Sequence, residues 1–102
     1  MAASNALRSI LPESLVAKVR ELGTRHGVRN IRVFGSFARG DAGPESDLDL
    51  LVDYVPGSGG FAFVEFCDEV EDLLGRKVDV VTVRSLHPLI RDKVLAQAVP
   101  LG

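Results

Sequence analysis

The sequence has little of what several classes of protein require. It contains a single cysteine, Cys67, so no disulfide can form within the chain, and we expect a reducing, cytoplasmic location. No apolar run approaches the roughly 18 residues that cross a bilayer, and the first five residues show no basic region followed by an apolar stretch. We therefore expect neither a membrane span nor a signal peptide. The net charge is −2, so the chain has no basic excess and we expect no direct nucleic-acid binding.

What is present suits one small α/β domain. The chain has 102 residues, 46% of them apolar, which predicts a single domain over residues 1–102, with disorder expected only within residues 1–8. Apolar residues at helical spacing predict three helices, over about 12–26, 63–74 and 86–99. Runs rich in β-branched residues predict three strands, over 31–34, 47–54 and 78–83. We expect a small mixed sheet with helices packed on it, without a defined strand order, and a mobile loop at the glycine-rich stretch 56–60.

The first stretch that suggests chemistry is Gly35-Ser36, where a strand ends and a short helical turn begins. Free backbone N–H groups at a helix start can bind phosphate oxygens, glycine lets the backbone approach, and the serine hydroxyl adds a donor. Taken alone, Gly-Ser is more often an ordinary turn. Arg39, three residues after Ser36, either contacts a triphosphate from a similar face or is solvated.

Asp47 and Asp49 strengthen the case for a site. Two residues apart on a strand, their side chains share one face at a separation of about 6–7 Å along the chain. Like charges this close repel, and aspartate is a poor strand former, so a purely structural strand has little use for them. A divalent cation relieves the repulsion, and Mg²⁺ prefers carboxylate oxygens and substrate phosphates. The alternative is a solvated strand start with Asp47 as a cap.

Asp79 is the third candidate ligand. It lies within the apolar run Val78–Val83, which we expect to be largely buried, and a lone buried carboxylate is costly unless it is paired or metal-bound. If this strand neighbours the strand of Asp49, the three acids form a triad that can hold two metal ions and a nucleotide triphosphate. The structural alternative is a salt bridge from Asp79 to a nearby basic residue, namely Arg76, Lys77 or Arg84.

Three other residues are given structural interpretations. Asp53 shares the face of the acidic pair but lies at the far end of its strand, so we interpret it as a strand terminus and not a ligand. Cys67 falls among the apolar positions of its helix and is expected in the core. His87 is expected to cap the helix that follows at Pro88.

These residues resemble a known family. Gly35-Ser36, ten intervening residues and then Asp47-Leu48-Asp49 match the nucleotidyltransferase signature of the DNA polymerase β superfamily. The longer strings at residues 35–40 and 46–53 are similar to its minimal members, the MNT-type proteins, which are commonly encoded beside a HEPN-domain partner as toxin–antitoxin pairs. Asp79 matches the position of the third acid.

The resemblance implies a nucleotidyltransferase-like fold, with Asp47, Asp49 and Asp79 as catalytic metal ligands and Gly35, Ser36 and Arg39 as nucleotide-binding residues. It also implies Mg²⁺, expected as two ions, with ATP as substrate. The implied activity is transfer of a nucleoside monophosphate, AMP, to a protein hydroxyl on a HEPN-type ribonuclease toxin, within a hetero-oligomer. Two alternatives remain: a non-catalytic antitoxin that masks the toxin, and a nucleotidyltransferase that acts on a small molecule or an RNA end. The intact acids favour the catalytic antitoxin.

Overall fold

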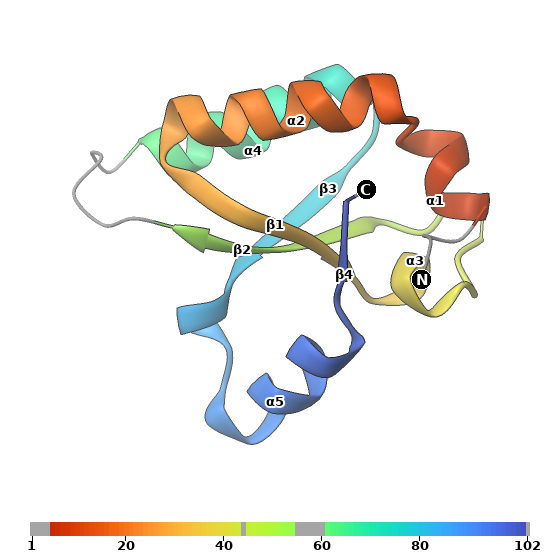
Figure 1. Cartoon of the computed structure of the whole chain (residues 1–102), viewed down its shortest axis with the longest axis vertical. Coiled ribbons are helices and arrows are strands. Elements are labelled where there is room, and N and C mark those ends of the chain that lie inside the picture. Colours follow the sequence, from red (N-terminus) through yellow and green to blue (C-terminus); the bar gives the residue numbers. More distant parts are fainter. Residues whose placement is uncertain (1–4, 44, 55–60, 102) are drawn as a thin grey trace.

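The computed structural model describes residues 5–43, 45–54 and 61–101, which form a small sheet with helices on both of its faces (Figure 1). The elements follow in the order α1 (Asn5–Ile10), α2 (Glu13–His26), β1 (Val28–Phe34), α3 (Ser36–Arg39), β2 (Leu48–Tyr54), α4 (Ala62–Leu74), β3 (Val78–Thr82), the 3₁₀ turn η1 (Val83–Ser85), α5 (Pro88–Gln97) and β4 (Val99–Pro100). None of the helices in these ranges is long and apolar enough to cross a membrane. The glycine-rich stretch expected to be a mobile loop lies outside the described residues.

The sheet is mixed, as the sequence predicts. Its four strands run in the order β3-β2-β1-β4. β1 is antiparallel to both β2 and β4, whereas β2 and β3 are parallel. A parallel pair needs a crossover connection, and α4 lies within the one that joins β2 to β3. This arrangement brings the two strands that carry the candidate acids side by side.

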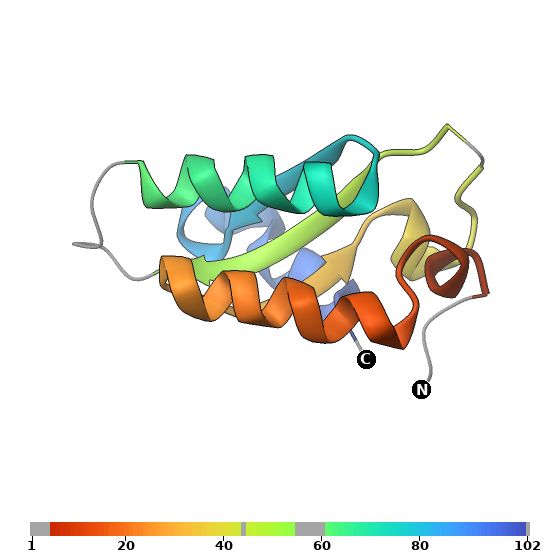
Figure 2. The ribbon, with the colours of Figure 1, turned by 90° about the horizontal axis from the view of Figure 1, so that it is seen from above.

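The main core lies between the sheet and the pair of helices α2 and α4, which run next to each other over one face (Figure 2). Val19 of α2 and Phe66 of α4 are almost completely buried there, and Leu48, Leu50 and Val52 of β2 point toward them. Burying such a side chain fully contributes roughly 1.5–3 kcal/mol. Because successive strand side chains alternate between faces, the residues between these β2 positions, including Asp49, point to the opposite face.

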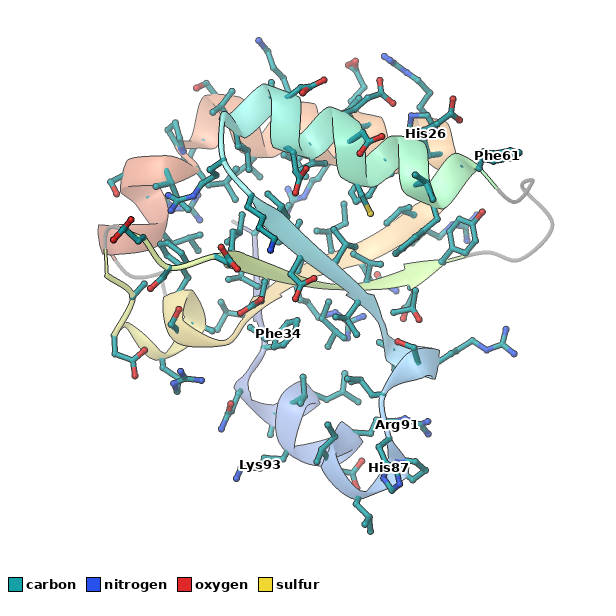
Figure 3. The ribbon with its side chains drawn as sticks, turned by 180° about the vertical axis from the view of Figure 1, so that it is seen from behind. His26, Phe34, Phe61, His87, Arg91 and Lys93 are labelled. Carbon is teal, nitrogen blue, oxygen red and sulfur yellow. The ribbon has the colours of Figure 1, made fainter. Side chains whose placement is uncertain are left out.

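The opposite face is covered much less. Phe34, at the end of β1, lies on this face, which α5 crosses at a distance from the sheet (Figure 3). None of the residues of α5 is buried, and Leu89 and Ile90 are exposed. Leu51 of β2 is fully buried on this second face, which also carries the half-buried Asp49 and the exposed Asp79.

The structure corrects several expected boundaries. A helix over Asn5–Ile10 replaces the disorder expected in that part of the chain, because Leu7 inserts into the core with an exposed fraction of 0%. β1 begins at Val28 instead of residue 31. β3 ends at Thr82, whose Oγ1 accepts a hydrogen bond from the N–H of Ser85 at 3.2 Å and so starts η1. The last helix begins at Pro88, not at residue 86.

Of two small features near the end of the chain, one agrees with the sequence prediction and one was not predicted. The cap at His87 is confirmed, because its Nδ1 accepts from the N–H of Leu89 at 3.1 Å. β4 is not predicted by the sequence, since it has two residues and one is proline. It pairs with β1 at Arg32 and Val33 and closes that edge of the sheet.

Candidate active site

Gly35 turns the chain from β1 into α3. Its backbone has φ 75° and ψ −149°, a region that residues with a side chain rarely occupy. The N–H groups of Ala38 and Arg39 both donate to its carbonyl, at 3.1 and 3.0 Å, and the predicted helical turn is confirmed. Ser36 is the first residue of that turn and is half-buried. The sequence therefore forms the strand–glycine–turn unit that the phosphate-binding interpretation needs.

The same glycine meets the acidic strand. A Cβ atom added at Gly35 would lie 2.3 Å from Oδ2 of Asp49, which is closer than any real contact of this kind. Phe34 and Asp49 are register partners in the antiparallel pair of β1 and β2. The absence of a side chain at position 35 is thus what lets the carboxylate of Asp49 pack against the turn, and the two halves of the signature lie in contact.

Asp49 and Asp79 are register partners across the parallel strands β2 and β3. Neighbouring strands are about 4.8 Å apart, so the two carboxylates stand next to each other on the same face. Burial raises the pKa of Asp49, and the charges of Asp79 and then Asp47 raise it further, whereas the charge of Arg39 lowers it. The condition set by the sequence, that the strands of Asp49 and Asp79 are neighbours, is met.

The surroundings of Asp79 differ from the expectation of burial. Asp79 is exposed, because β3 is the outer strand of the sheet and α2 and α4 cover only the other face. The cost of a lone buried carboxylate is therefore not an argument for a metal at this position. The structural alternative fails as well: in the described part of the chain, Asp79 forms no ion pair with Arg76, Lys77 or Arg84.

The acids do not form a closed ligand set by themselves. Asp47 lies just before β2, which begins at Leu48 and not at residue 47 as expected, and it is exposed. Among the described residues, no three acidic, histidine or cysteine side chains are grouped so that they could hold a metal ion. The strands provide two carboxylates in register, those of Asp49 on β2 and Asp79 on β3. The third, that of Asp47, lies just before the first residue of β2.

Arg39 lies in solvent beside the site. Its side chain is 51% exposed, and Nε donates to Oδ2 of Asp41 at 3.2 Å. Its charge nevertheless acts on the carboxyl of Asp49 and favours the ionised form. Both interpretations made from the sequence, a solvated arginine and a phosphate contact, are compatible with this position.

Of the residues that were given structural interpretations, Asp53 agrees with its interpretation, whereas Cys67 is not among the core residues. Asp53 accepts hydrogen bonds from Asn30 Nδ2 at 2.7 Å and from Arg32 Nη2 at 3.3 Å, so its carboxylate is engaged away from the other acids. Cys67 is half-buried, and burial, followed by the charges of Asp68 and Glu71, raises the pKa of its thiol. A raised pKa leaves little thiolate at neutral pH, which agrees with a packing role.

One residue next to the site was considered from the sequence only as a partner for Asp79. Arg76, in the turn between α4 and β3, donates through Nη2 to the carbonyl of Ser46 at 2.9 Å. Its guanidinium carbon also lies 5.4 Å from the centre of the Phe37 ring. From the sequence alone, a basic residue three positions before a candidate acid is only a weak signal of a place in the site. The residue that accepts its hydrogen bond, Ser46, is 30 residues away in the sequence.

The donor set fits a hard divalent cation. Asp49 and Asp79 offer carboxylate oxygens side by side, and the mutual repulsion that raises the pKa of Asp49 is what a bound cation would relieve. The turn at Gly35 and Ser36 faces the same carboxylate and could take phosphate oxygens. Together these features make this a candidate site for a metal-bound nucleotide.

Comparison with known families agrees with this class of site. The profile of the nucleotidyltransferase domain matches residues 14–100, which include all the candidate residues. The chain therefore belongs to the nucleotidyltransferase domain family. The sheet and the helices on it are its nucleotidyltransferase fold.

Individual relatives narrow the class to its minimal members. Protein adenylyltransferase MntA of Thermococcus cleftensis is 44% identical over 85 residues, which cover 83% of this chain and 86% of that protein. A solved structure of a candidate minimal nucleotidyltransferase superposes with a TM-score of 0.80 at 40% identity, covering 92% of this chain and 94% of the other. A toxin–antitoxin crystal structure with AMP-PNP matches with a TM-score of 0.69 at 25% identity, covering 85% of this chain and 72% of that one.

Proposed function

We propose that the chain is a Mg²⁺-dependent protein adenylyltransferase that acts as the antitoxin of a HEPN-type ribonuclease toxin in the cytoplasm. The observation that carries the proposal is the contact of the two halves of the signature: Asp49, in register with Asp79, packs against Gly35. This geometry puts metal-binding oxygens beside a turn suited to phosphate. The similarity to MntA supports a protein as the acceptor.

In this proposal Asp49 and Asp79 begin the metal site, expected to take two ions, and Asp47 joins them when the metal and the nucleotide bind. Gly35, Ser36 and Arg39 bind the nucleotide. Bound Mg²⁺ neutralises charge on the triphosphate and lowers the pKa of the attacking hydroxyl. In the transfer, a bond forms between the acceptor oxygen and the α-phosphorus of ATP, and the bond between the α-phosphorus and its bridging oxygen breaks. Pyrophosphate leaves, and the acceptor hydroxyl loses its proton to solvent.

The acceptor is delivered by the partner. Positioning supplies a large share of catalysis in phosphoryl-type transfer, and the candidate site lies on the sparsely covered face of the sheet. The toxin–antitoxin structure with AMP-PNP, at 25% identity, supports a nucleotide and a protein partner in one assembly. The family resemblance points to a HEPN-type ribonuclease, modified on a tyrosine.

The test is the intact mass of a HEPN-type toxin purified together with this protein, after incubation with ATP and Mg²⁺. We expect one or a few adenylyl groups to be added by the wild type and none by the Asp47→Ala, Asp49→Ala double variant. Asp53→Asn is a matched control, because this acid lies on the same strand but is bonded to Asn30 and Arg32. It should leave the transfer unchanged.

Two outcomes would replace the proposal. If the double variant neutralises the toxin as well as the wild type and no mass is added in either case, the protein masks its partner by binding. If adenylyl transfer occurs only to a small molecule or to an RNA end supplied in the same assay, the acceptor class is wrong while the enzymatic class stands.

A further inference from the structure

Arg76 connects three separate pieces of the candidate site. It is half-buried in the turn between α4 and β3, and it makes the two contacts described above, with the carbonyl of Ser46 and with the ring of Phe37. Ser46 is the residue before Asp47, and Phe37 is the residue after Ser36. Asp79 follows Arg76 by three positions in β3. One guanidinium therefore contacts the neighbours of the metal-binding and the nucleotide-binding candidates.

Among its described residues, the loop that Arg76 holds has other contacts at its beginning and within itself, and Ala42 packs against the main core. At its start, the N–H of Asp41 donates to the carbonyl of Ser36 at 3.1 Å. Near its end, Ser46 and Gly43 close a turn, with Ser46 N–H donating to the Gly43 carbonyl at 3.1 Å and Gly43 N–H donating to Ser46 Oγ at 2.8 Å. Through its hydrogen bond to the carbonyl of Ser46, Arg76 ties this turn to the rest of the fold just before Asp47.

The support for Arg76 is itself fixed. Gly75 ends α4 in the left-handed region at φ 65°, and its N–H donates to the carbonyl of Glu71 at 2.8 Å. The carboxylate of Glu71 accepts from the N–H of Val78 at 3.0 Å, which closes the turn before β3. Phe37 is 2% exposed and belongs to the main core. Arg76 thus connects a rigid turn and a buried ring to the end of the loop, next to Asp47.

We propose that Arg76 is a positioning residue of the transfer reaction, which sets Asp47 and the turn at Ser36 relative to the carboxylates of β2 and β3. This inference rests on the proposed function. The charge of Arg39 acts on Asp49, and Arg76 contacts the backbone of Ser46 and the ring of Phe37. A planar guanidinium can lie over a ring and donate from its edge at the same time, which an ammonium group cannot do as well.

The experiment compares Arg76→Lys and Arg76→Ala with Arg91→Lys and Arg91→Ala. Arg91 is the matched control, because it is also half-buried and its Nη2 also donates to a backbone carbonyl, that of Leu86 at 3.1 Å. It lies on α5 and contacts none of the candidate site residues through that bond (Figure 3). For each variant we would measure Tm, kcat and KM for ATP with the toxin partner, and the Mg²⁺ concentration that gives half of the nucleotide-dependent rise in Tm.

We expect Arg76→Lys to lower kcat about 10- to 100-fold, the effect of a displacement near 1 Å, with a much smaller change in KM for ATP. The Mg²⁺ concentration for the half-maximal Tm rise should increase about tenfold, since a looser Asp47 binds the ion less well. The Arg91 variants should show wild-type kcat and Mg²⁺ dependence even where their Tm falls. If Arg76→Ala does not fold, Arg76→Lys carries the comparison.

The inference is overturned if the Arg76 variants keep the wild-type kcat and Mg²⁺ dependence, or if the Arg91 variants lose them equally at the same loss of Tm. A wild type that binds Mg²⁺ and ATP but transfers nothing contradicts the proposed function instead. In that case the Mg²⁺ dependence of Tm still separates Arg76 from Arg91, because it needs no transfer.

Discussion

When no cation is bound, the surroundings of Asp49 in the folded protein disfavour its ionised form. Burial and the neighbouring acids raise its pKa in the folded protein above the value in the unfolded chain. A group of this kind contributes stability below its unfolded pKa, and that contribution is lost as the pH rises through its folded pKa. At neutral pH the ionised carboxylate therefore destabilises the metal-free protein.

We predict that Asp49→Asn raises the Tm of the metal-free protein at neutral pH, because the amide keeps the shape and removes the repulsion. The gain should shrink as the pH falls through the raised pKa of Asp49 and disappear below about 4, where an ordinary aspartate is also protonated. Thermal melts in a chelator across a pH series test this. The control Asp53→Asn should lower Tm slightly, because this acid pairs with Arg32. A lower Tm for Asp49→Asn than for the wild type at neutral pH would contradict the prediction.

Gly35 offers a second test at a single position. Gly35→Ala should cost on the order of 1–3 kcal/mol, because an alanine is strained at this φ and ψ, and its Cβ would also displace the carboxylate of Asp49. Gly75→Ala is the matched control, since Gly75 also has a positive φ, 65°, but an added Cβ meets nothing within 4 Å. Strain alone costs it roughly 1–2 kcal/mol.

We expect the two glycine variants to differ in ligand binding more than in stability. Gly35→Ala should lose the Mg²⁺-dependent response to ATP, whereas Gly75→Ala should keep it at a reduced Tm. The measurement is a thermal shift titration of both variants. Equal responses to Mg²⁺ and ATP would show that the approach of Asp49 to Gly35 is not needed for the site.

At the scale of elements, the sequence predicts the parts whose signals are local. Helices α2 and α4 have apolar residues at helical spacing and end at glycines in the left-handed region, Gly27 and Gly75, so both their type and their ends can be predicted. The turn of α3 and the strand β2 follow from Gly35 and from the acidic pair in the same way. Most of the nucleotide signature therefore needs no structure to be recognised.

The rest depends on contacts that a pattern does not contain. The apolar run around Asp79 resembles a buried strand, but whether it is covered depends on its place at the edge of the sheet. β4 forms only because β1 offers an unpaired edge at Arg32 and Val33. The link from Arg76 to Ser46 joins residues that are 30 positions apart, and no local rule pairs them.

α5 contributes to the structure mainly as a connection between η1 and β4. None of its residues is buried, and Leu89 is 86% exposed. We predict that Leu89→Ala changes the free energy of unfolding by no more than about 0.5 kcal/mol. The comparison is Phe66→Ala in α4, where a ring with 0% exposure is removed from the core and the loss should be about 3–5 kcal/mol. Urea denaturation measures both, and a loss near that of Phe66→Ala at Leu89 would mean that α5 packs more tightly than the structure indicates.

At the scale of the whole molecule, both ends of the described chain are held against the sheet. The guanidinium of Arg8 donates to the carbonyl of Leu11 at 2.9 Å and also to the carbonyl of Leu101, which lies 93 positions away. Leu101 is fully buried, and β4 just before it pairs with β1. The fold is thus closed by contacts between its first and last segments, and unfolding is expected to be a single cooperative event.

Binding of Mg²⁺ and ATP should stabilise this cooperative unit by mass action. At a ligand concentration about 100 times Kd the gain is about 2.7 kcal/mol, which for a domain of this size raises Tm on the order of 10 °C. Addition of EDTA should abolish the rise, and Asp49→Asn should show none at any ATP concentration. A rise of the same size with ATP in EDTA would mean that the carboxylates are not holding a metal.

The contact between Gly35 and Asp49 also has an evolutionary meaning. The space that a methyl group would take at position 35 is filled by a carboxylate oxygen, so the two positions constrain each other for as long as the acid is needed. A lineage that came to neutralise its toxin by binding alone would lose the need for Asp49 first. A side chain at position 35 would then be disfavoured only by the strained backbone conformation there. Descendants that have given up catalysis should therefore change at both positions together, while the glycines that only end helices stay under the same selection as before.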